Sequence, residues 1–358
     1  MSSTSSIVSV KEKIRYDINV HREQNKQILL NSRRGVIVYE EDIDNVFTIE
    51  DMKNLALEIK HRRKVTIKHL KVLKHALLNG QEFILSFYQI QGAVDSLLHF
   101  MSSKNEGVQL AAIECICNMA LGDKKTCIKL TKIITPYLMI YINSWNFNLS
   151  CMSIWTLGNL CDSNEESCKL LQNQNFFCTL IESLKNSTCD EVILNTFYAL
   201  KLFLKTYIYQ LEIEELNKLL LVCFERLNFW KESFWIVYQI SCRHDCDLLN
   251  ANLIKQLFFS IQDEDIIDIK CLVAILRTIG NIVAKDNSSY SANEIIIGLK
   301  NSGPFIRNIL IKNRQINLND ECAWVLGNVF NVLQITELHN NNYITAEDFN
   351  EICNYLFV

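Results

Sequence analysis

The chain has 358 residues, of which 49% are hydrophobic and 21% are charged, and its formal net charge is −4. This composition can bury a continuous core and excludes a wholly disordered chain, and the mild acidity argues against bulk nucleic-acid binding. Only 2 prolines and 10 glycines occur, which favours long helices over a turn-rich β architecture.

The first 46 residues divide into three segments by composition. Residues 1–10 form a serine-rich tail that we expect to be disordered, without the cationic start and apolar core of a secretory signal. Residues 11–35 form a basic segment with a thin apolar stripe, and such a segment can become a helix on a partner surface. Residues 36–46 form an acidic linker that contains EEDID.

From residue 47 onward the apolar pattern is helical nearly throughout. Thr48 followed by Asp51 resembles a capping box, which predicts that a helix starts there. The basic stretch KHRRK at 60–64 has a helical spacing, so we interpret it as a solvated helix face, with a localisation signal as the alternative. The most apolar stretch, 133–142, is shorter than the roughly 20 residues of a membrane span and predicts a core helix.

The 14 cysteines have no regular spacing. We therefore expect a reduced intracellular protein in which they serve as small core residues. The cluster Cys242-Arg-His-Asp-Cys246 resembles half of a metal-binding motif, but zinc usually needs a second ligand pair. The sequence predicts no metal site and no cofactor.

A short phrase recurs along the chain. It reads IWTLGNL at 154–160, FWIVYQI at 234–240, LRTIGNI at 276–282 and AWVLGNV at 323–329, with fainter copies CICNM at 115–119 and TFYALKL at 196–202. Its last polar residue falls at Asn118, Asn159, Lys201, Gln239, Asn281 and Asn328, with gaps of 41, 42, 38, 42 and 47 positions. A period near 40 is typical of stacked helical units.

The period predicts an all-α solenoid of about seven repeats over residues 47–335, followed by a C-terminal cap at 336–358. We expect each unit to contain a short helix, a longer apolar helix such as 169–184, and the helix that carries the phrase. Gly158, Gly280 and Gly327 recur inside the phrase at a cost in helix propensity, which suggests that close helix packing needs them.

Trp155 and Asn159 are four residues apart, as are Trp324 and Asn328, so each pair lies on one face of its helix. A carboxamide can hold the backbone of an extended peptide, and an indole can pack lysine methylenes and attract the cation. The alternative is that each tryptophan packs in the core. Repetition in register favours a surface that binds an extended basic peptide.

The segments SIWTLGNLCDS, LRTIGNIVAKD and CAWVLGNVF occur in an order that resembles the armadillo-repeat importin alpha family of nuclear import adaptors, over about residues 75–335. The chain resembles the divergent armadillo branch of transmembrane and coiled-coil domain-containing protein 6 at least as closely. The resemblance implies a right-handed superhelical armadillo solenoid without enzymatic activity, found in cytoplasm and nucleus. It also implies that basic nuclear localisation signals of cargo bind in a concave groove and that an importin-beta-type carrier binds the N-terminal segment, with no nucleic acid or membrane involved.

The resemblance also implies site residues. The major peptide site would use Asn118, Trp155 and Asn159, with Asp162 as an acidic contact, and the minor site would use Arg277, Asn281, Trp324 and Asn328. The importin-beta-binding segment would use Arg15, Arg22, Lys26, Arg33 and Arg34.

Several positions depart from the family pattern. Glu114 stands where the first tryptophan is expected, and Phe197 and Lys201 replace a tryptophan–asparagine pair. A lysine repels a basic peptide and cannot accept a backbone hydrogen bond. The alternative function is therefore an armadillo scaffold that has lost the binding of localisation signals. An enzyme is not expected, because the 7 histidines are scattered and no nucleophile–base pattern is present.

Overall fold

In a computed structural model the chain divides between Thr48 and Ile49 into two units. The structure describes residues 47–61, 65–162, 164–227, 230–243, 251–262, 267–285, 289–313, 318–337 and 346–357. All helices named below belong to the unit Ile49–Val358. The predicted tail, basic segment and acidic linker of residues 1–46 lie outside the described residues, as does most of the cysteine cluster at 242–246.

The described residues are mainly helical, and no β-strand occurs among them. The helices are α2 (Ile49–His61), α3 (Ile67–Ala76), η1 (Leu77–Asn79), α4 (Gln81–Gln89), α5 (Ala93–Met101), α6 (Glu106–Met119), α7 (Lys124–Ile142), α8 (Phe147–Cys161), α9 (Glu165–Gln172), α10 (Phe176–Asn186), α11 (Asp190–Tyr207), η2 (Ile208–Gln210), α12 (Ile213–Arg226), α13 (Lys231–Ser241), α14 (Ala251–Ile261), α15 (Ile269–Lys285), α16 (Ser289–Lys312), α17 (Asn319–Glu337) and α18 (Ala346–Leu356). The predicted all-α fold is confirmed.

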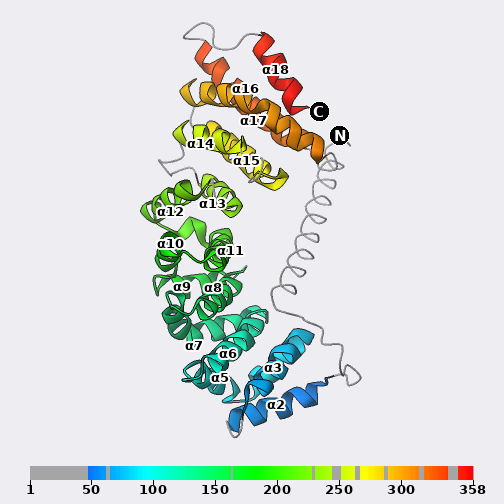
Figure 1. Cartoon of the computed structure of the whole chain (residues 1–358), viewed down its shortest axis with the longest axis vertical. Helices are drawn as coiled ribbons and strands as arrows, with labels where there is room; N and C mark the ends of the chain where they lie inside the picture. Colours follow the sequence, from blue (N-terminus) through cyan, green and yellow to red (C-terminus); the bar gives the residue numbers. More distant parts are fainter. Residues whose placement is uncertain are drawn as a thin grey trace, which may run out of the picture. The chain divides into compact units, whose positions relative to one another are not determined.

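One layer of the array consists of helices that each contact the next: α3, α6, α8, α11, α13, α15 and α17. We call them the ladder helices. All but α3 carry a copy of the repeated phrase, and Figure 1 shows them following one another in chain order within the described array. Their number agrees with the prediction of about seven repeats.

The units differ in how many helices precede the ladder helix. Two units have three helices, α4–α5–α6 and α9–α10–α11. In α7 and α16 a single long helix replaces the first two, and each of these helices contains one of the prolines, Pro136 and Pro304. Proline inside a helix removes one hydrogen bond and favours a kink. Both α7 and α16 therefore lack one backbone hydrogen bond in their interior.

The predicted helix over 169–184 is wrong, because the chain turns between α9 and α10. Asn175 has φ 58°, a left-handed conformation that interrupts a right-handed helix and that asparagine tolerates better than most residues. The capping prediction at Thr48 is better supported, since α2 begins at Ile49. Similar signals start later helices: the Asn146 side chain accepts from the amides of Asn148 and Leu149 at the start of α8.

Apolar contacts between α10 and α11 show how a unit builds its core. Phe176 and Phe177 of α10 both pack on Phe203 of α11, with ring centres 5.7 and 5.6 Å apart. All three rings are fully buried. Burying a phenylalanine side chain stabilises a fold by about 1.5–3 kcal/mol, so such clusters hold the units together.

The phrase glycines divide into two kinds. A Cβ on Gly158 would lie 3.0 Å from Ala199 Cα in the next ladder helix, and a Cβ on Gly280 would overlap the Trp324 indole. Close packing therefore needs these two glycines, as predicted. The same prediction is wrong for Gly327, where nothing lies within 4 Å of an added Cβ.

The predicted core helix at 133–142 forms part of α7 and is buried on one side. Ile134 and Leu138 are buried, whereas Ile140 is 75% exposed. No helix among the described residues is long and apolar enough to cross a bilayer. Most of the described cysteines are buried, in agreement with their expected role as small core residues.

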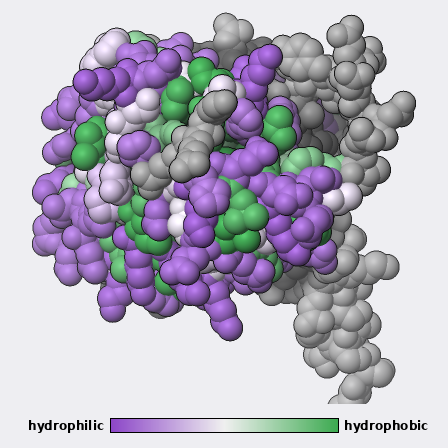
Figure 2. Space-filling view, turned by 90° about the horizontal axis from the view of Figure 1, so that it is seen from below, coloured by the Kyte–Doolittle hydropathy of each residue, from purple (hydrophilic) through white to green (hydrophobic). Residues whose placement is uncertain are grey.

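The last helix, α18, packs on α16. At the α2 end, the described residues present a mainly hydrophilic surface with smaller apolar groups (Figure 2). This surface fits the terminal unit of the described array.

Candidate peptide-binding face

The polar residue that ends the repeated phrase joins neighbouring ladder helices. In five copies its carboxamide nitrogen donates to the preceding ladder helix. The pairs are Asn118 with Lys74 O (2.8 Å), Asn159 with Cys117 Sγ (3.5 Å), Gln239 with Lys201 O (3.0 Å), Asn281 with Ser241 Oγ (2.9 Å) and Asn328 with Gly280 O (3.2 Å). We call these five residues the ladder amides. Each ties its unit to the unit before it.

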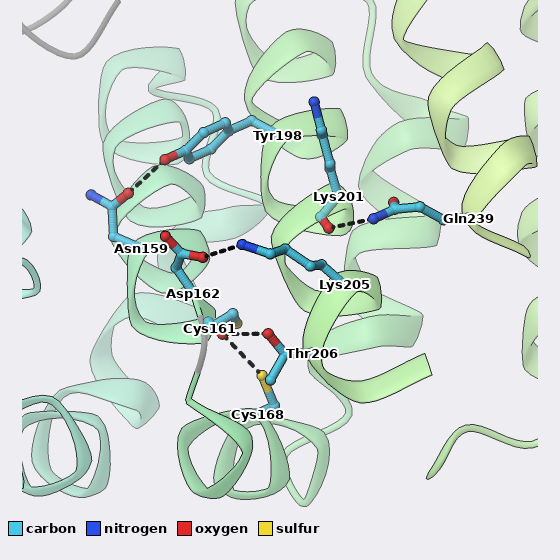
Figure 3. A network of polar contacts seen from close by, with 9 residues as sticks. All are labelled: Asn159, Cys161, Asp162, Cys168, Tyr198, Lys201, Lys205, Thr206 and Gln239. Carbon is cyan, nitrogen blue, oxygen red and sulfur yellow. Dashed lines mark hydrogen bonds and ion pairs between the residues drawn. The ribbon is translucent and has the colours of Figure 1, made fainter. Parts of the chain in front are cut away.

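Asn159 is engaged through both polar atoms. Its Oδ1 accepts a hydrogen bond from the Tyr198 hydroxyl of α11 at 2.9 Å (Figure 3), and its Nδ2 contacts Cys117 of α6. Trp155, one turn earlier in α8, packs on the same tyrosine with ring centres 5.5 Å apart. Asn159 and Trp155 are 6% and 8% exposed, so this part of α8 lies largely inside the array.

At the α11 position the phrase carries Lys201 instead of an amide. Its carbonyl accepts from Gln239, while its side chain leaves the hydrogen-bonded ladder (Figure 3). The Lys201 ammonium stands 5.4 Å from the ring centre of Trp235 in α13, which is the geometry of a cation–π contact. The substitution in the phrase thus places a cation on an indole of the next unit.

Three carboxylates along the ladder are each paired with a cation from an adjacent ladder helix. The pairs are Glu114 with Lys74 (3.0 Å), Asp162 with Lys205 (3.3 Å) and Glu321 with Arg277 (2.7 Å). The carboxylates are half-buried, so solvent screens these pairs less than fully exposed ones. Each of these three carboxylates is therefore offset by a cation of a neighbouring ladder helix.

Arg277 bridges three ladder helices. Its guanidinium lies 5.8 Å from the ring centre of Tyr238 in α13 and bonds Glu321 in α17. Burial lowers the pKa of Arg277, but the bond to Glu321 and the nearby Tyr238 outweigh this and leave the pKa raised. The side chain stays protonated at any working pH and acts as a fixed cation.

These contacts join side chains of successive ladder helices, and we call the strip formed by these side chains together with Trp324 the ladder face. It is made of Glu114, Trp155, Asn159, Asp162, Tyr198, Lys201, Lys205, Trp235, Tyr238, Arg277, Asn281, Glu321, Trp324 and Asn328. Indole rings, carboxamides and carboxylates alternate along it with the chain's own cations. Such a strip can hold the backbone and the basic side chains of an extended segment.

The predicted site residues differ in accessibility. Asn118 is 1% exposed, and Trp155 and Asn159 are also buried, so the predicted major site is closed in this arrangement. Asp162, Arg277, Asn281 and Asn328 are half-buried. Trp324 is 42% exposed and packs one side of its indole against Gly280. Their role in peptide binding stays a prediction, with the Trp324 end the more open.

Sequence reasoning missed Lys205, Trp235 and Glu321, although a signal for two of them was available. Lys205 follows Asp162 by 43 positions, and Glu321 follows Arg277 by 44, which is about one repeat period in both cases. Opposite charges one period apart therefore mark contacts between neighbouring ladder helices. Among the described residues no group of three or more His, Cys, Asp or Glu is placed to hold a metal ion.

Known structures resemble this chain in fold. An engineered protein of known structure matches with a TM-score of 0.56 and 14% identity, over 88% of this chain and 85% of its own. A designed armadillo repeat protein matches at a TM-score of 0.45 and 16% identity, over 79% and 98% of the two chains. Another, in complex with the peptide (KR)4, matches at 0.43 and 15% over the same shares. No family model matches the chain, and no curated protein does.

The chain has an all-α fold built of repeated helical units. At identities this low the likeness concerns the fold alone. The comparisons carry no support for membership of the importin alpha family or of the branch of transmembrane and coiled-coil domain-containing protein 6. Both resemblances stay hypotheses that rest on the repeated phrase.

Proposed function

We propose that the chain is a non-enzymatic repeat scaffold that binds an extended basic segment of a partner protein along the ladder face. What supports the proposal is that this face already binds cations supplied by the chain: Lys201 on an indole, Lys205 and Lys74 on carboxylates, and Arg277 on both a ring and a carboxylate. A surface built this way has the chemistry that a basic peptide needs.

The part of the face nearest α17 is the best candidate for first contact. Trp324 and Asn328 lie one turn apart on α17, and the indole has its free side toward solvent. The amide nitrogen of Asn328 donates a hydrogen bond to Gly280 O, and the carboxamide oxygen can accept one from a peptide N–H. The indole offers its exposed face to a lysine or arginine side chain.

The test is a titration of the full chain with a labelled peptide of alternating lysine and arginine, followed by fluorescence anisotropy. We expect binding that weakens as salt rises, and about tenfold weaker binding for the double variant Trp324→Ala, Asn328→Ala. Trp145→Ala is the matched control, because this indole is 81% exposed in the turn between α7 and α8. Equal binding of a glutamate-containing peptide of the same length would contradict the proposal.

In its finer form the proposal is a nuclear import adaptor, present in cytoplasm and nucleus, whose segment 11–35 binds an importin-beta-type carrier. It is motivated by the order of the phrases and by the basic residues Arg15, Arg22, Lys26, Arg33 and Arg34. Charge reversal at Arg33 and Arg34 is expected to abolish capture by an immobilised carrier and to leave anisotropy of the peptide complex detectable. If the carrier still captures the chain after charge reversal at Arg33 and Arg34, the adaptor hypothesis is contradicted.

A second candidate is a scaffold whose ligand is not basic. Two observations favour it: both polar atoms of Asn159 are engaged within the array, and Lys201 projects a cation onto the face. Under this reading the wild-type chain shows no salt-sensitive binding of basic peptides. Substitutions at Trp324 and Asn328 would then leave its partners bound.

A further inference from the structure

Helix α11 supplies two lysines to the ladder face, and they reach in opposite directions. Lys201 and Lys205 are one turn apart and both exposed. Lys205 Nζ lies 3.3 Å from Asp162 Oδ1, just beyond the end of α8 (Figure 3). Lys201 Nζ stands over the Trp235 ring of α13 at 5.4 Å. One helix thus places cations on both of its neighbours.

A carboxylate and an indole face are two groups with which a protein surface holds the basic side chains of a ligand. At the middle of this ladder both groups hold side chains of the protein itself. We propose that Lys201 and Lys205 act as internal substitutes for the basic residues of a ligand, and occupy the cation positions at Trp235 and Asp162. The two lysines are thereby specificity-determining residues of the ladder face.

The consequence is a ladder face divided into two parts. A basic segment that runs from α8 to α13 meets two like charges and finds both cation positions taken. Lysine has no acceptor, so Lys201 also cannot hold a peptide N–H where an asparagine could. The wild-type chain therefore selects ligands whose basic residues avoid the middle of the face. This inference rests on the proposed function, in that the ligand is a basic segment.

The test compares two charge-matched double variants of the full chain. The first is Lys201→Gln with Lys205→Gln, which vacates both cation positions. The second is Lys185→Gln with Lys218→Gln, which removes the same charge from exposed sites on α10 and α12. The probe is a labelled peptide of alternating lysine and arginine, long enough to extend over three ladder helices, followed by fluorescence anisotropy at low salt.

We expect the Lys201, Lys205 variant to bind the peptide about five- to thirtyfold more tightly than wild type, from one vacated indole and one vacated carboxylate. The Lys185, Lys218 variant should stay within about twofold of wild type, because it vacates neither the position at Trp235 nor the position at Asp162. Equal tightening in both variants would mean that only net charge matters and would overturn the proposal.

A second measurement assigns the gain to the indole. In a Trp235→Ala background, Lys201→Gln should tighten binding less than it does in wild type, because the cation position on the indole is gone and only the relief of like-charge repulsion remains. Unchanged tightening in that background would overturn the assignment to Trp235. Circular dichroism of each variant shows that the helices are intact.

The outcomes separate this proposal from the proposed function. If wild type binds the peptide and the Lys201, Lys205 variant binds it no more tightly, the proposed function stands. The proposal that the two lysines substitute for ligand cations is then overturned. A gain in that variant with no binding by wild type supports the substitution and contradicts the function. Binding by neither protein overturns both.

Discussion

The Tyr198 hydroxyl of α11 donates to the carboxamide oxygen of Asn159 in α8 across 2.9 Å. The same carboxamide donates to Cys117 of α6, so a single side chain joins three consecutive ladder helices. Asn159 is 6% exposed, and water can replace neither contact without opening the array. The phrase asparagine therefore acts here as a link between units, whether or not a ligand binds nearby.

Replacing Asn159 should destabilise the array. Asn159→Ala removes the hydrogen bond from the Tyr198 hydroxyl to the carboxamide and opens a small cavity, at a cost of about 1–3 kcal/mol in the free energy of unfolding. Tyr198→Phe should cost about 1 kcal/mol. Urea denaturation followed by circular dichroism measures both, and the double variant should lose less than the sum. Strictly additive losses would show that the two residues are not coupled.

The phrase glycines should respond in opposite ways to alanine. Gly158→Ala forces a methyl group against the Ala199 backbone and should lower the unfolding free energy by about 1–3 kcal/mol. Gly327→Ala places its methyl in open space and should raise it by up to about 1 kcal/mol, because alanine favours the helix. Thermal unfolding of the two variants is the measurement. A loss at both positions would contradict the assigned packing.

High pH should weaken the fold through its buried thiols. Burial raises the pKa of Cys127 to about 11 and those of Cys271 and Cys322 to about 12. The pKa of an unfolded cysteine is about 8.5, so above that pH the unfolded state has lost protons that the folded state still holds. Stability is thus fully present below about pH 8.5 and falls as pH rises toward the folded values, by about 1.4 kcal/mol per unit for each thiol.

The midpoints of urea denaturation at neutral pH and at about pH 10, under reducing conditions, measure this loss of unfolding free energy. Cys127→Ala removes one titrating group, so the pH dependence of this variant should be shallower than that of wild type. An identical slope in the two proteins would mean that Cys127 is not protected by burial.

Arg277 should contribute to the association of α13, α15 and α17. Arg277→Met removes the 2.7 Å ion pair and leaves the Glu321 carboxylate half-buried without its cation, at a cost of about 1 kcal/mol. Arg277→Lys keeps the charge but loses the planar contact with Tyr238, so it should recover only part of the loss. Denaturation at low and high salt measures both, with the difference between wild type and Arg277→Met expected to shrink as salt rises.

The repeat period could be read from the chain because each unit needs the same apolar helix and the same link to its neighbour. The positions of Asn118, Asn159, Gln239, Asn281 and Asn328 predicted the spacing of the ladder helices, and α6, α8, α13, α15 and α17 bear it out. Helix ends were harder to predict. The break at Asn175 depends on one residue in a left-handed conformation, which apolar periodicity does not register.

The candidate site was predictable in its residue types and less so in its accessibility. Trp155 and Trp324 stand at equivalent positions of the phrase, yet one indole is covered by Tyr198 and the other is 42% exposed. Tyr198 belongs to α11, the ladder helix that follows α8, whereas α17 is the last ladder helix among the described residues and packs its indole on Gly280 of the preceding α15. A pattern within one helix carries no record of what the next helix places against it.

The amino-acid sequence by itself determines the all-α repeat fold, because a phrase that returns every 40 residues or so lets each unit bury its apolar helices against the next. Only the tertiary structure decides what the polar side chains of the phrase do. An asparagine can donate to a ligand or to the helix beside it, and a lysine can repel a ligand's cation or take its place on an indole. The choice is made by distances between residues about one period apart, such as Asn159 to Cys117 and Lys205 to Asp162.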